Sequence, residues 1–268
     1  MTSFIQNTDF FAGNNPETIA SEYGTPVYVY NEKILRDRMA KVAKVITKYP
    51  YTANYSVKAN TNIHILKLAL EEGLNCDAMS VGEITLLMKA GFPVERIFFV
   101  PNNVAPYELA FALKNGVMTS LDSLSQLELF GEVCNQMKIE PEKRKCAVRI
   151  NPGVGAGHCE KVVTGGKKTK FGIAEYSIPQ IFEIAEKYQI TIAGINQHIG
   201  SLFMDPQPYL DAVTNLLRIA HQFKNLEFID FGGGYGIPYH KLDDEKDFPM
   251  EDFKSRLEPI LDEFVASY

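Results

Sequence analysis

Short runs rich in β-branched and aromatic residues alternate along most of the chain with longer stretches in which apolar residues recur at helical spacing. The short runs predict strands at 52–57, 75–78, 97–100, 118–121, 147–150, 193–198 and 228–231. The stretches between them predict helices at 63–72, 81–90, 106–115, 123–137, 178–187 and 208–222. Strands that alternate with helices in this way are typical of parallel βα units.

The beginning of the chain predicts a short helix and one strand ahead of this alternation. Asn15 is placed to cap a helix that has Pro16 at its first position. Residues 27–30 are β-branched or aromatic and predict a strand. Asn31 then caps a longer predicted helix over 32–47, which has apolar residues on one face.

The repeated βα unit, with no second zone of composition, favours a (β/α)8-type barrel, and an open doubly wound sheet also fits the pattern. In such a barrel the chemistry lies at the C-terminal ends of the strands. Residues 151–171 form the longest stretch without periodicity and are rich in glycine and lysine. Because a loop of that length in a compact domain is usually functional, candidate chemistry is expected there and directly after the strands.

The composition narrows the class of protein. Of the 268 residues, 46% are hydrophobic and 22% are charged, which is ordinary for a soluble globular protein with a substantial core. The net charge of -6 argues against non-specific binding to nucleic acid. No apolar run approaches the roughly 20 residues of a membrane span, and residues 1–10 lack the pattern of a signal peptide. A cytoplasmic protein without nucleic-acid or membrane partners is expected.

The four cysteines are Cys76, Cys134, Cys146 and Cys159, and no two of them form a Cys-x-x-Cys pair. Zinc-type spacing is absent, so no metal site is expected, and a disulfide framework is not expected in a chain of this size. Cys76 and Cys146 lie in apolar strand-like runs and are predicted to be buried thiols of a reduced protein.

Charged residues occur at the end of, or inside, three predicted strands. Lys58 follows the first strand, where a lysine pointing into a pocket and a solvated lysine are about equally supported. Asp77 ends the apolar run of the second strand and can cap the next helix together with Ser80, with which Glu83 can complete a capping box. Arg149 lies inside an apolar strand, where a buried cation needs a partner such as Asp77.

Two further features follow the last two predicted strands. His198 lies at the expected active edge, although a single histidine at a strand end is more often structural. Gly232, Gly233 and Gly234 follow the last strand, where glycines let backbone N–H groups approach a phosphate closely. The Gly-x-Gly-x-x-Gly order of a dinucleotide site is absent. A bare glycine turn is the alternative, but three consecutive glycines carry an entropic cost that requires a reason.

Six motifs, in order along the chain, resemble those of one group of enzymes. They are Tyr-Ser-Val-Lys-Ala-Asn at 55–60, Asp-x-x-Ser-x-x-Glu at 77–83, Arg-Ile-Asn-Pro at 149–152, Thr-Gly-x-Lys-x-x-Lys-Phe-Gly at 164–172, His-x-Gly-Ser at 198–201 and the glycine run within 228–238. Together they make the chain similar to the alanine-racemase-like, fold-type III pyridoxal-phosphate enzymes, and within these to the diaminopimelate decarboxylase family. The resemblance spans positions 25–238 and implies an α/β barrel that binds pyridoxal 5′-phosphate.

The resemblance also implies roles for the charged residues. The matching lysine of the family carries the cofactor as a Schiff base, which assigns that role to Lys58. Asp77 matches an aspartate near this lysine, where a carboxylate can hold the amine or its hydrogen-bond network in place. Arg149 is expected to help orient the cofactor ring or His198.

The remaining motifs imply contacts with the cofactor ring, its phosphate and the substrate. His198 matches a histidine whose flat ring stacks on the pyridine. Ser201 and the glycines 232–234 match the groups that hold the phosphate. Lys170 and the other lysines of the 164–172 motif would attract an anionic substrate or close over it, although such a run is usually a solvated patch.

The activity implied by the resemblance is the decarboxylation of meso-2,6-diaminopimelate to L-lysine, with a small amino acid as substrate. A related amino-acid or polyamine-precursor decarboxylase shares the motifs. A pyridoxal-phosphate-binding protein without catalytic activity is the alternative of another class. The resemblance further implies a homodimer for the full-length protein.

The family pattern is incomplete toward the C-terminus. The Glu-Pro-Gly-Arg motif of the family's eighth strand is absent, since Glu258 and Pro259 are followed by other residues. The expected organisation is a helix and strand in 1–30, which join a β-domain in the family, followed by a barrel in 31–268 that lacks its last strand and the β-domain. The chain is therefore expected to be a fragment and a poor catalyst by itself.

Overall fold

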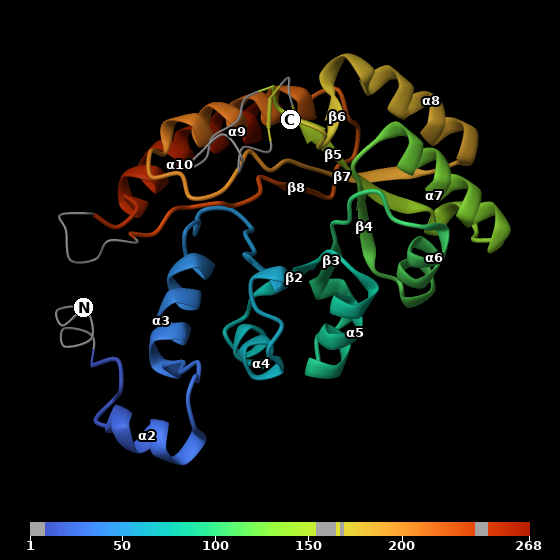
Figure 1. Ribbon diagram of the computed structural model, residues 1–268. Coiled ribbons are helices and arrows are strands. Elements are labelled where there is room, and N and C mark those ends of the chain that lie inside the picture. The colour runs from blue at the N-terminus through green and yellow to red at the C-terminus, as the bar shows by residue number, and fades with distance from the viewer. Residues whose placement is uncertain (1–8, 154–164, 167–168, 239–245) are drawn as a thin grey trace.

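The computed structural model describes residues 9–153, 165–166, 169–238 and 246–268. Two helices, α2 (Pro16–Tyr23) and α3 (Glu32–Ala43), precede one curved sheet that is covered on its outer face by helices (Figure 1). The strands are β1 (Asn54–Ser56), β2 (Asn75–Ala78), β3 (Ile97–Phe99), β4 (Met118–Leu121), β5 (Lys145–Asn151), β6 (Ile173–Ala174), β7 (Thr191–Asn196) and β8 (Phe228–Asp230). The later helices are α4 (Ile63–Glu71), α5 (Val81–Ala90), α6 (Pro106–Asn115), α7 (Leu124–Gln136), α8 (Ile178–Tyr188), α9 (Gln207–Ala220) and α10 (Met250–Ser267).

Neighbouring strands of the sheet are parallel and follow the order β1-β2-β3-β4-β5-β7-β8, and β6 lies off this path, paired to β5. β1 and β8 lie at the two ends of this order and do not pair with each other in the described part of the chain. The sheet is therefore a curled half-barrel with its helices outside (Figure 1). The predicted barrel-type α/β class is confirmed.

The structure differs from the predicted elements mainly at the two ends of the chain. Residues 27–30 form no strand, and three of their side chains are exposed, those of Val27, Tyr28 and Tyr30. A β-branched and aromatic run needs a neighbouring strand for its hydrogen bonds, and the described residues offer none here. The helix predicted at 32–47 ends at Ala43. β6 and α10 were not predicted from the sequence.

Side-chain caps and left-handed glycines set the helix boundaries. The side chains of Asn31, Asn62 and Ser80 each accept a hydrogen bond from the first turn of the helix that follows. Gly91 and Gly116 end α5 and α6 in the left-handed conformation, which glycine adopts without strain. These stops return the chain to the sheet within a few residues, so that each strand starts in register with its neighbour.

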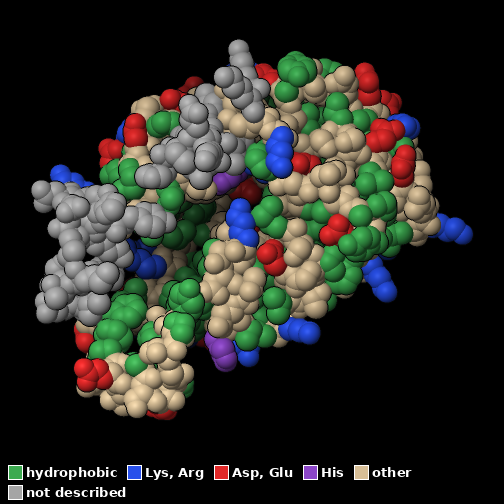
Figure 2. Space-filling model, in the orientation of Figure 1, with side chains coloured by type: hydrophobic (Ala, Val, Ile, Leu, Met, Phe, Trp, Pro, Cys, Tyr) green, Lys and Arg blue, Asp and Glu red, His purple; other side chains and the backbone are tan. Residues whose placement is uncertain are grey.

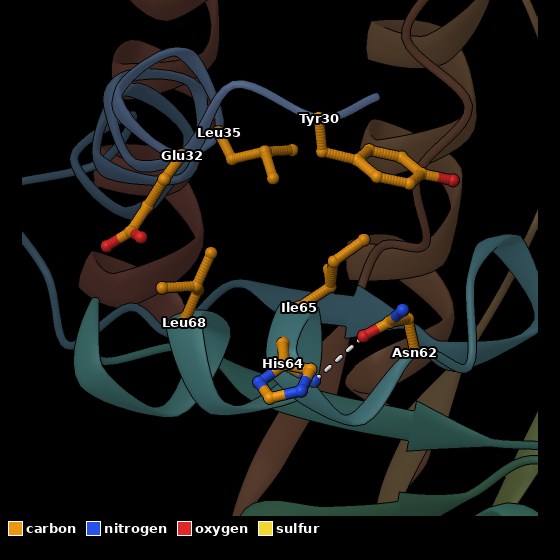
Figure 3. A pocket seen from close by; sticks show the side chains of 7 residues that line it. All are labelled: Tyr30, Glu32, Leu35, Asn62, His64, Ile65 and Leu68. Atoms are coloured by element: carbon orange, nitrogen blue, oxygen red, sulfur yellow. Dashed lines mark hydrogen bonds between the residues drawn. The ribbon is translucent and has the colours of Figure 1, made fainter. Parts of the chain in front are cut away.

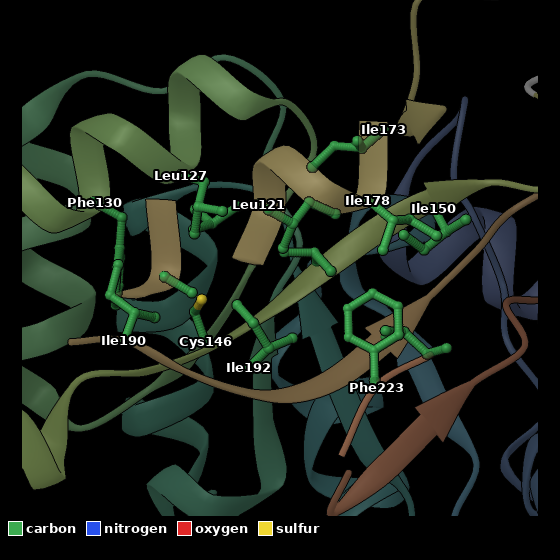
Figure 4. Close-up of a cluster of buried hydrophobic side chains, with 14 of the residues drawn as sticks. Leu121, Leu127, Phe130, Cys146, Ile150, Ile173, Ile178, Ile190, Ile192 and Phe223 are labelled. Atoms are coloured by element: carbon green, nitrogen blue, oxygen red, sulfur yellow. The ribbon is translucent and has the colours of Figure 1, made fainter. Parts of the chain in front are cut away.

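Alternate residues of the strands face the helices and form the hydrophobic core. Cys76 and Ala78 of β2 belong to one buried cluster, and Ile150 of β5 belongs to a second one between sheet and helices (Figure 4). Because successive side chains of a strand point to opposite faces, Asp77 and Arg149 point to the concave face. The core thus fixes which side chains can take part in a site inside the half-barrel.

Helix α10 connects the two ends of the half-barrel. Leu257 is buried in a cluster that also contains Val45 and Ile46, the residues that follow α3. Lys48 donates a hydrogen bond to Asp262 at 2.6 Å. The segment before β1 is therefore packed against the helix that follows β8, although the two strands do not pair.

Three cysteines, Cys76, Cys134 and Cys146, are free and buried, which confirms the prediction for Cys76 and Cys146. Burial raises the pKa of Cys76 to about 12 and that of Cys134 to about 11, so neither is a reactive thiolate near neutral pH. Cys159 lies outside the described residues. Among the residues that the structure describes, no helix has the length and apolar character needed to cross a membrane.

Candidate active site

The C-terminal ends of the strands bring the predicted site residues to the concave side of the half-barrel. Ser56 of β1 lies in register with Asp77 of β2. Further along the sheet, Arg149, Asn196 and Asp230 are in register across β5, β7 and β8. In Figure 2, basic, acidic and histidine atoms gather around a recess at the centre of the face shown.

Lys58 is carried by a single 3-10 turn, η1 (Val57–Ala59), directly after β1. Its side chain is exposed, whereas the preceding Val57 is fully buried and anchors the turn. Asp77 faces this turn, and its Oδ2 accepts a hydrogen bond from Ser56 Oγ at 3.0 Å. Burial raises the pKa of Asp77, against the opposing effects of the Ser56 hydrogen bond and the Lys58 charge. Its other oxygen, Oδ1, is buried and has no hydrogen-bond partner among the described residues.

His198 follows β7 on the other side of the arc. Burial, together with the charges of Arg149 and Lys58, lowers the pKa of its imidazole to about 4. The ring is therefore neutral at neutral pH. Lys58 acts electrostatically on both His198 and Asp77, so the half-barrel brings these three predicted residues together at the C-terminal ends of β1, β2 and β7.

Arg149 is buried, with 6% of its surface exposed. Its guanidinium lies over the ring of Phe171 at 4.8 Å from the centroid. The ion pair expected with Asp77 is not found, since no carboxylate oxygen of the described residues lies within ion-pair distance of Arg149. Burial lowers the pKa of Arg149, and the charges of Asp122 and Asp230 oppose this. The aromatic face and these two more distant carboxylates compensate the buried cation in place of a direct partner.

The predicted glycine turn follows β8 and is held by hydrogen bonds on three sides. The Gly232 N–H donates to Asp230 Oδ1 at 2.8 Å, and the Gly232 carbonyl accepts from the Tyr209 hydroxyl at 2.8 Å. The Gly234 carbonyl accepts from the Phe203 N–H at 3.2 Å. Burial raises the pKa of Asp230 to about 6.

Two of the three glycines are required by the fold and one is not. Gly232 and Gly234 have φ of +72° and +112°, and a Cβ on either would collide with the backbone carbonyl of Gln197 or Gly200, respectively. Gly233 is outside the left-handed region, and a Cβ there would meet nothing within 4 Å. The space beside Gly233 is therefore open, as a cradle for a phosphate requires.

The segment that carries Ser201 lies beside this turn. Phe203 and Tyr235 form a parallel bridge, and the Gly236 N–H donates to the Phe203 carbonyl at 2.8 Å. The Gly200 carbonyl lies close to Gly234, because a Cβ on Gly234 would collide with it. The structure thus places the predicted phosphate-binding residues Ser201 and Gly232 to Gly234 next to one another.

The lysine-rich loop is described only in part, and Thr164, Lys167 and Lys168 lie outside the described residues. Asn151 at the end of β5 holds the loop: its amide donates to the Gly166 carbonyl at 3.0 Å, and its Oδ1 accepts from the Gly166 N–H at 2.9 Å. The Gly165 N–H donates to the Ile199 carbonyl at 3.3 Å, beside His198. Lys170 is exposed.

Ser80 and Glu83 serve the helix that follows β2. Ser80 Oγ accepts from the Glu83 N–H at 3.2 Å, and Glu83 Oε2 accepts from the Met79 N–H at 2.6 Å. Ser80 caps the helix as predicted, but Glu83 bonds the N–H of Met79, the residue before the cap, and not that of Ser80, so the predicted capping box is formed only in part. Asp77 takes no part in the cap, because its carboxylate is directed to Ser56 instead.

The surface pocket in Figure 3 lies apart from the strand-end residues. Its volume is about 210 Å³, and it lies between the start of α3, with Tyr30 ahead of it, and the start of α4, with Asn62 ahead of it. It is lined by Tyr30, Glu32, Leu35, Asn62, His64, Ile65 and Leu68. None of these residues belongs to the site described above.

Several residues of the site were missed by sequence reasoning. Ser56, Phe171 and Asp230 lie inside motifs that were identified, but no role was assigned to them. The role of Asp230 could have been suspected from the sequence, because an acidic residue within an apolar strand is unusual. Tyr209 carried none, since an aromatic residue on an amphipathic helix is most simply a core residue.

The concave face has the groups that a pyridoxal phosphate molecule requires. Lys58 offers an amine whose charge acts on the buried Asp77, and one oxygen of Asp77 lacks a partner among the described residues. His198 offers a flat neutral ring. The turn at Gly233 offers open space, and the N–H groups of Gly233 and Gly234 make no hydrogen bond to a described residue. The residues present therefore fit this cofactor.

Fold and site together define the class of protein. The family model for the pyridoxal-binding domain of the pyridoxal-dependent decarboxylases matches residues 32–267. The chain belongs to this family, which confirms the family and the pyridoxal cofactor predicted from the motifs.

Individual relatives are more specific. The chain is 38% identical to the diaminopimelate decarboxylase of Methanothermobacter thermautotrophicus, over 96% of this chain and 60% of that protein. It is 31% identical to the diaminopimelate decarboxylase of Aquifex aeolicus, over 96% of this chain and 61% of that protein. The chain thus spans about three fifths of the length of these curated relatives.

Solved structures show the same relationship. Diaminopimelate decarboxylase from Helicobacter pylori, complexed with L-lysine, has a TM-score of 0.84 at 26% identity, covering 92% of this chain and 63% of that one. A lysine/ornithine decarboxylase from Vibrio vulnificus, complexed with putrescine, has a TM-score of 0.76 at 21% identity, covering 92% and 62%. At that identity the second likeness shows the fold alone.

Proposed function

We propose that the chain is the cofactor-binding part of a diaminopimelate decarboxylase, which converts meso-2,6-diaminopimelate to L-lysine and carbon dioxide. The observation that carries the proposal is the 38% identity to the enzyme of that name from Methanothermobacter thermautotrophicus over 96% of this chain. The neighbour from Helicobacter pylori, whose structure contains L-lysine, supports it because L-lysine is the product of this reaction.

The residues at the strand ends have distinct parts in this proposal. When bound, pyridoxal phosphate supplies a conjugated ring that takes up the electron pair left by the departing carboxylate. Lys58 would hold the aldehyde carbon of the cofactor, while Ser201 and the glycine turn would hold its phosphate. His198 would lie against the ring face, where a neutral imidazole stacks without adding a charge to be desolvated.

Asp77 would hold the Lys58 amine by a hydrogen bond, and Arg149 would influence the protonation of His198. The Asp77 oxygen without a partner can accept a hydrogen bond from the Lys58 amine, and Ser56 keeps the other oxygen in place. Arg149 packs against Phe171, and its charge disfavours protonation of the His198 imidazole. In this proposal Asp77 would hold the Lys58 amine, and Arg149 would keep the His198 ring neutral.

A related decarboxylase acting on another amino acid, and a pyridoxal-phosphate-binding protein without activity, are the alternatives. The predicted homodimer and the predicted cytoplasmic location stay predictions. The substrate is tested by steady-state release of carbon dioxide from meso-diaminopimelate, L-lysine and L-ornithine, with the protein expressed from its complete gene and saturated with pyridoxal phosphate.

We expect the highest kcat/KM for meso-diaminopimelate and no turnover by the Lys58→Ala variant. Faster turnover of L-ornithine would favour the related decarboxylase. Binding of the cofactor without turnover of any of the three substrates would favour the non-catalytic protein.

A further inference from the structure

A pair of hydrogen-bonded tyrosine hydroxyls lies behind the glycine turn. Tyr209 of α9 is 2% exposed, and its hydroxyl donates to the Gly232 carbonyl at 2.8 Å. The Tyr235 hydroxyl donates in turn to the Tyr209 hydroxyl at 3.2 Å. Because the Tyr209 oxygen accepts from Tyr235, the Tyr209 O–H is left to donate to the Gly232 carbonyl of the turn.

The two rings are held by packing that does not depend on their hydroxyls. Tyr209 stacks on Phe203 at 5.3 Å between centroids, and both tyrosines lie against Phe253, at 5.5 Å and 5.3 Å. Tyr235 also packs against Phe248 at 5.2 Å. Replacement of either tyrosine by phenylalanine should therefore keep the aromatic cluster and remove only a hydrogen bond.

The geometry of the peptide bond links the Tyr209 contact to the open side of the turn. The Gly232 carbonyl and the Gly233 N–H belong to one planar trans peptide unit and point in opposite directions. The Tyr209 hydroxyl draws the carbonyl toward the aromatic cluster, so the Gly233 N–H points away from it. Asp230 fixes the other side of Gly232 by accepting from its N–H at 2.8 Å.

We propose that Tyr209, supported by Tyr235, is a positioning residue that aims the Gly233 N–H at an anion, which under the function proposed above is the phosphate of the cofactor. Two features require such a device. Gly232 and Gly234 adopt conformations that are open mainly to glycine, and a turn of three glycines has many alternatives of similar energy. The pair of tyrosine hydroxyls selects one of these conformations before the ligand arrives.

The test uses Tyr209→Phe and Tyr235→Phe, with Tyr188→Phe as the matched control. Tyr188 is also buried and its hydroxyl donates to Glu128 at 3.1 Å, but it lies on α8, outside the site. Affinity is measured for pyridoxal phosphate and for pyridoxal, which lacks the phosphate, in cofactor-free protein. Hydrogen exchange of peptides covering 228–238 is measured without ligand.

We expect Tyr209→Phe to weaken pyridoxal phosphate binding about two- to tenfold, the range of one neutral hydrogen bond, with pyridoxal affinity unchanged. Tyr235→Phe should have a smaller effect of the same kind, and Tyr188→Phe none. Exchange in 228–238 should be faster in Tyr209→Phe than in the parent.

Unchanged exchange and unchanged pyridoxal phosphate affinity in Tyr209→Phe would overturn the inference, as would an equal loss for pyridoxal. The exchange comparison needs no cofactor and no substrate. A protein that fails to decarboxylate meso-diaminopimelate would refute the proposed function. The hydrogen-exchange result would still test the role of Tyr209.

Discussion

Replacement of Gly233 by alanine should weaken cofactor binding without destabilising the fold. The two neighbouring glycines serve as matched controls. A Cβ at Gly233 would meet no heavy atom within 4 Å, and its φ lies outside the left-handed region. A Cβ at Gly232 would collide with the carbonyl of Gln197, and one at Gly234 with that of Gly200. Three adjacent Gly→Ala changes thus have different physical consequences.

The expected magnitudes follow from these surroundings. Gly233→Ala should leave the free energy of unfolding unchanged or raise it by about 0.4–1 kcal/mol, because alanine restricts the unfolded chain. Gly232→Ala and Gly234→Ala should lower it by about 1–2 kcal/mol for the left-handed backbone alone, before the collisions are added. If the Gly233 methyl group keeps the phosphate from one N–H, the lost charge-assisted bond is worth about 1.5–3 kcal/mol, or about 10- to 150-fold in Kd.

Urea unfolding of the cofactor-free proteins gives the stabilities, and spectroscopic titration with pyridoxal phosphate and pyridoxal gives the affinities. Gly233→Val, with a larger side chain, should lose more affinity for pyridoxal phosphate than Gly233→Ala. The reasoning is refuted if Gly233→Ala binds pyridoxal phosphate as tightly as the parent, or if it unfolds as readily as Gly232→Ala.

Two further predictions concern the titratable groups of the site. His198→Ala should weaken cofactor binding by a larger free energy than it removes from unfolding, which paired titration and urea experiments measure; the reverse order would make His198 a structural residue. Burial holds the pKa of His198 near 4, so between there and 6.5 the unfolded chain binds a proton that the folded chain does not, and stability rises with pH. Burial raises the pKa of Asp230 from 3.8 to about 6, so over nearly the same range its contribution falls as pH rises. Asp230→Asn should therefore make stability of the cofactor-free protein rise more steeply from pH 4 to 6.5 than in the parent, and an unchanged slope would contradict these assignments.

Most strands and helices between positions 52 and 231 were predictable because each has an apolar face toward one of the buried clusters. In β2, for example, the apolar Cys76 and Ala78 are buried in the core, and the polar Asp77 between them faces the other side of the sheet. The failures occur where that signal is absent. β6 has two residues after a loop of glycine and lysine, and the run at 27–30 has strand-like side chains without a strand to pair with. A helix over Pro259 contradicts local propensity, and burial of Leu257 and Leu261 in α10 overrides it.

The candidate site was predictable as far as its motifs are local. Lys58, His198 and the glycine turn follow strands, and the half-barrel brings them to one face as expected. Contacts between distant segments were not predictable. Nothing in the sequence connects Tyr209 to Gly232, and Arg149 was expected to need a carboxylate, whereas the fold provides the ring of Phe171.

Whether Lys58 holds the cofactor is tested most directly by borohydride reduction of the protein with pyridoxal phosphate bound, followed by peptide mapping. Its position on η1, with charge effects on both Asp77 and His198, predicts that the reduced label is found on Lys58. Lys58→Arg should carry no label, and Lys170→Arg, which changes an exposed lysine of the neighbouring loop, should be labelled like the parent. A label on Lys170 or any other lysine of the parent protein, with Lys58 unmodified, would contradict the assignment of this face as the cofactor site.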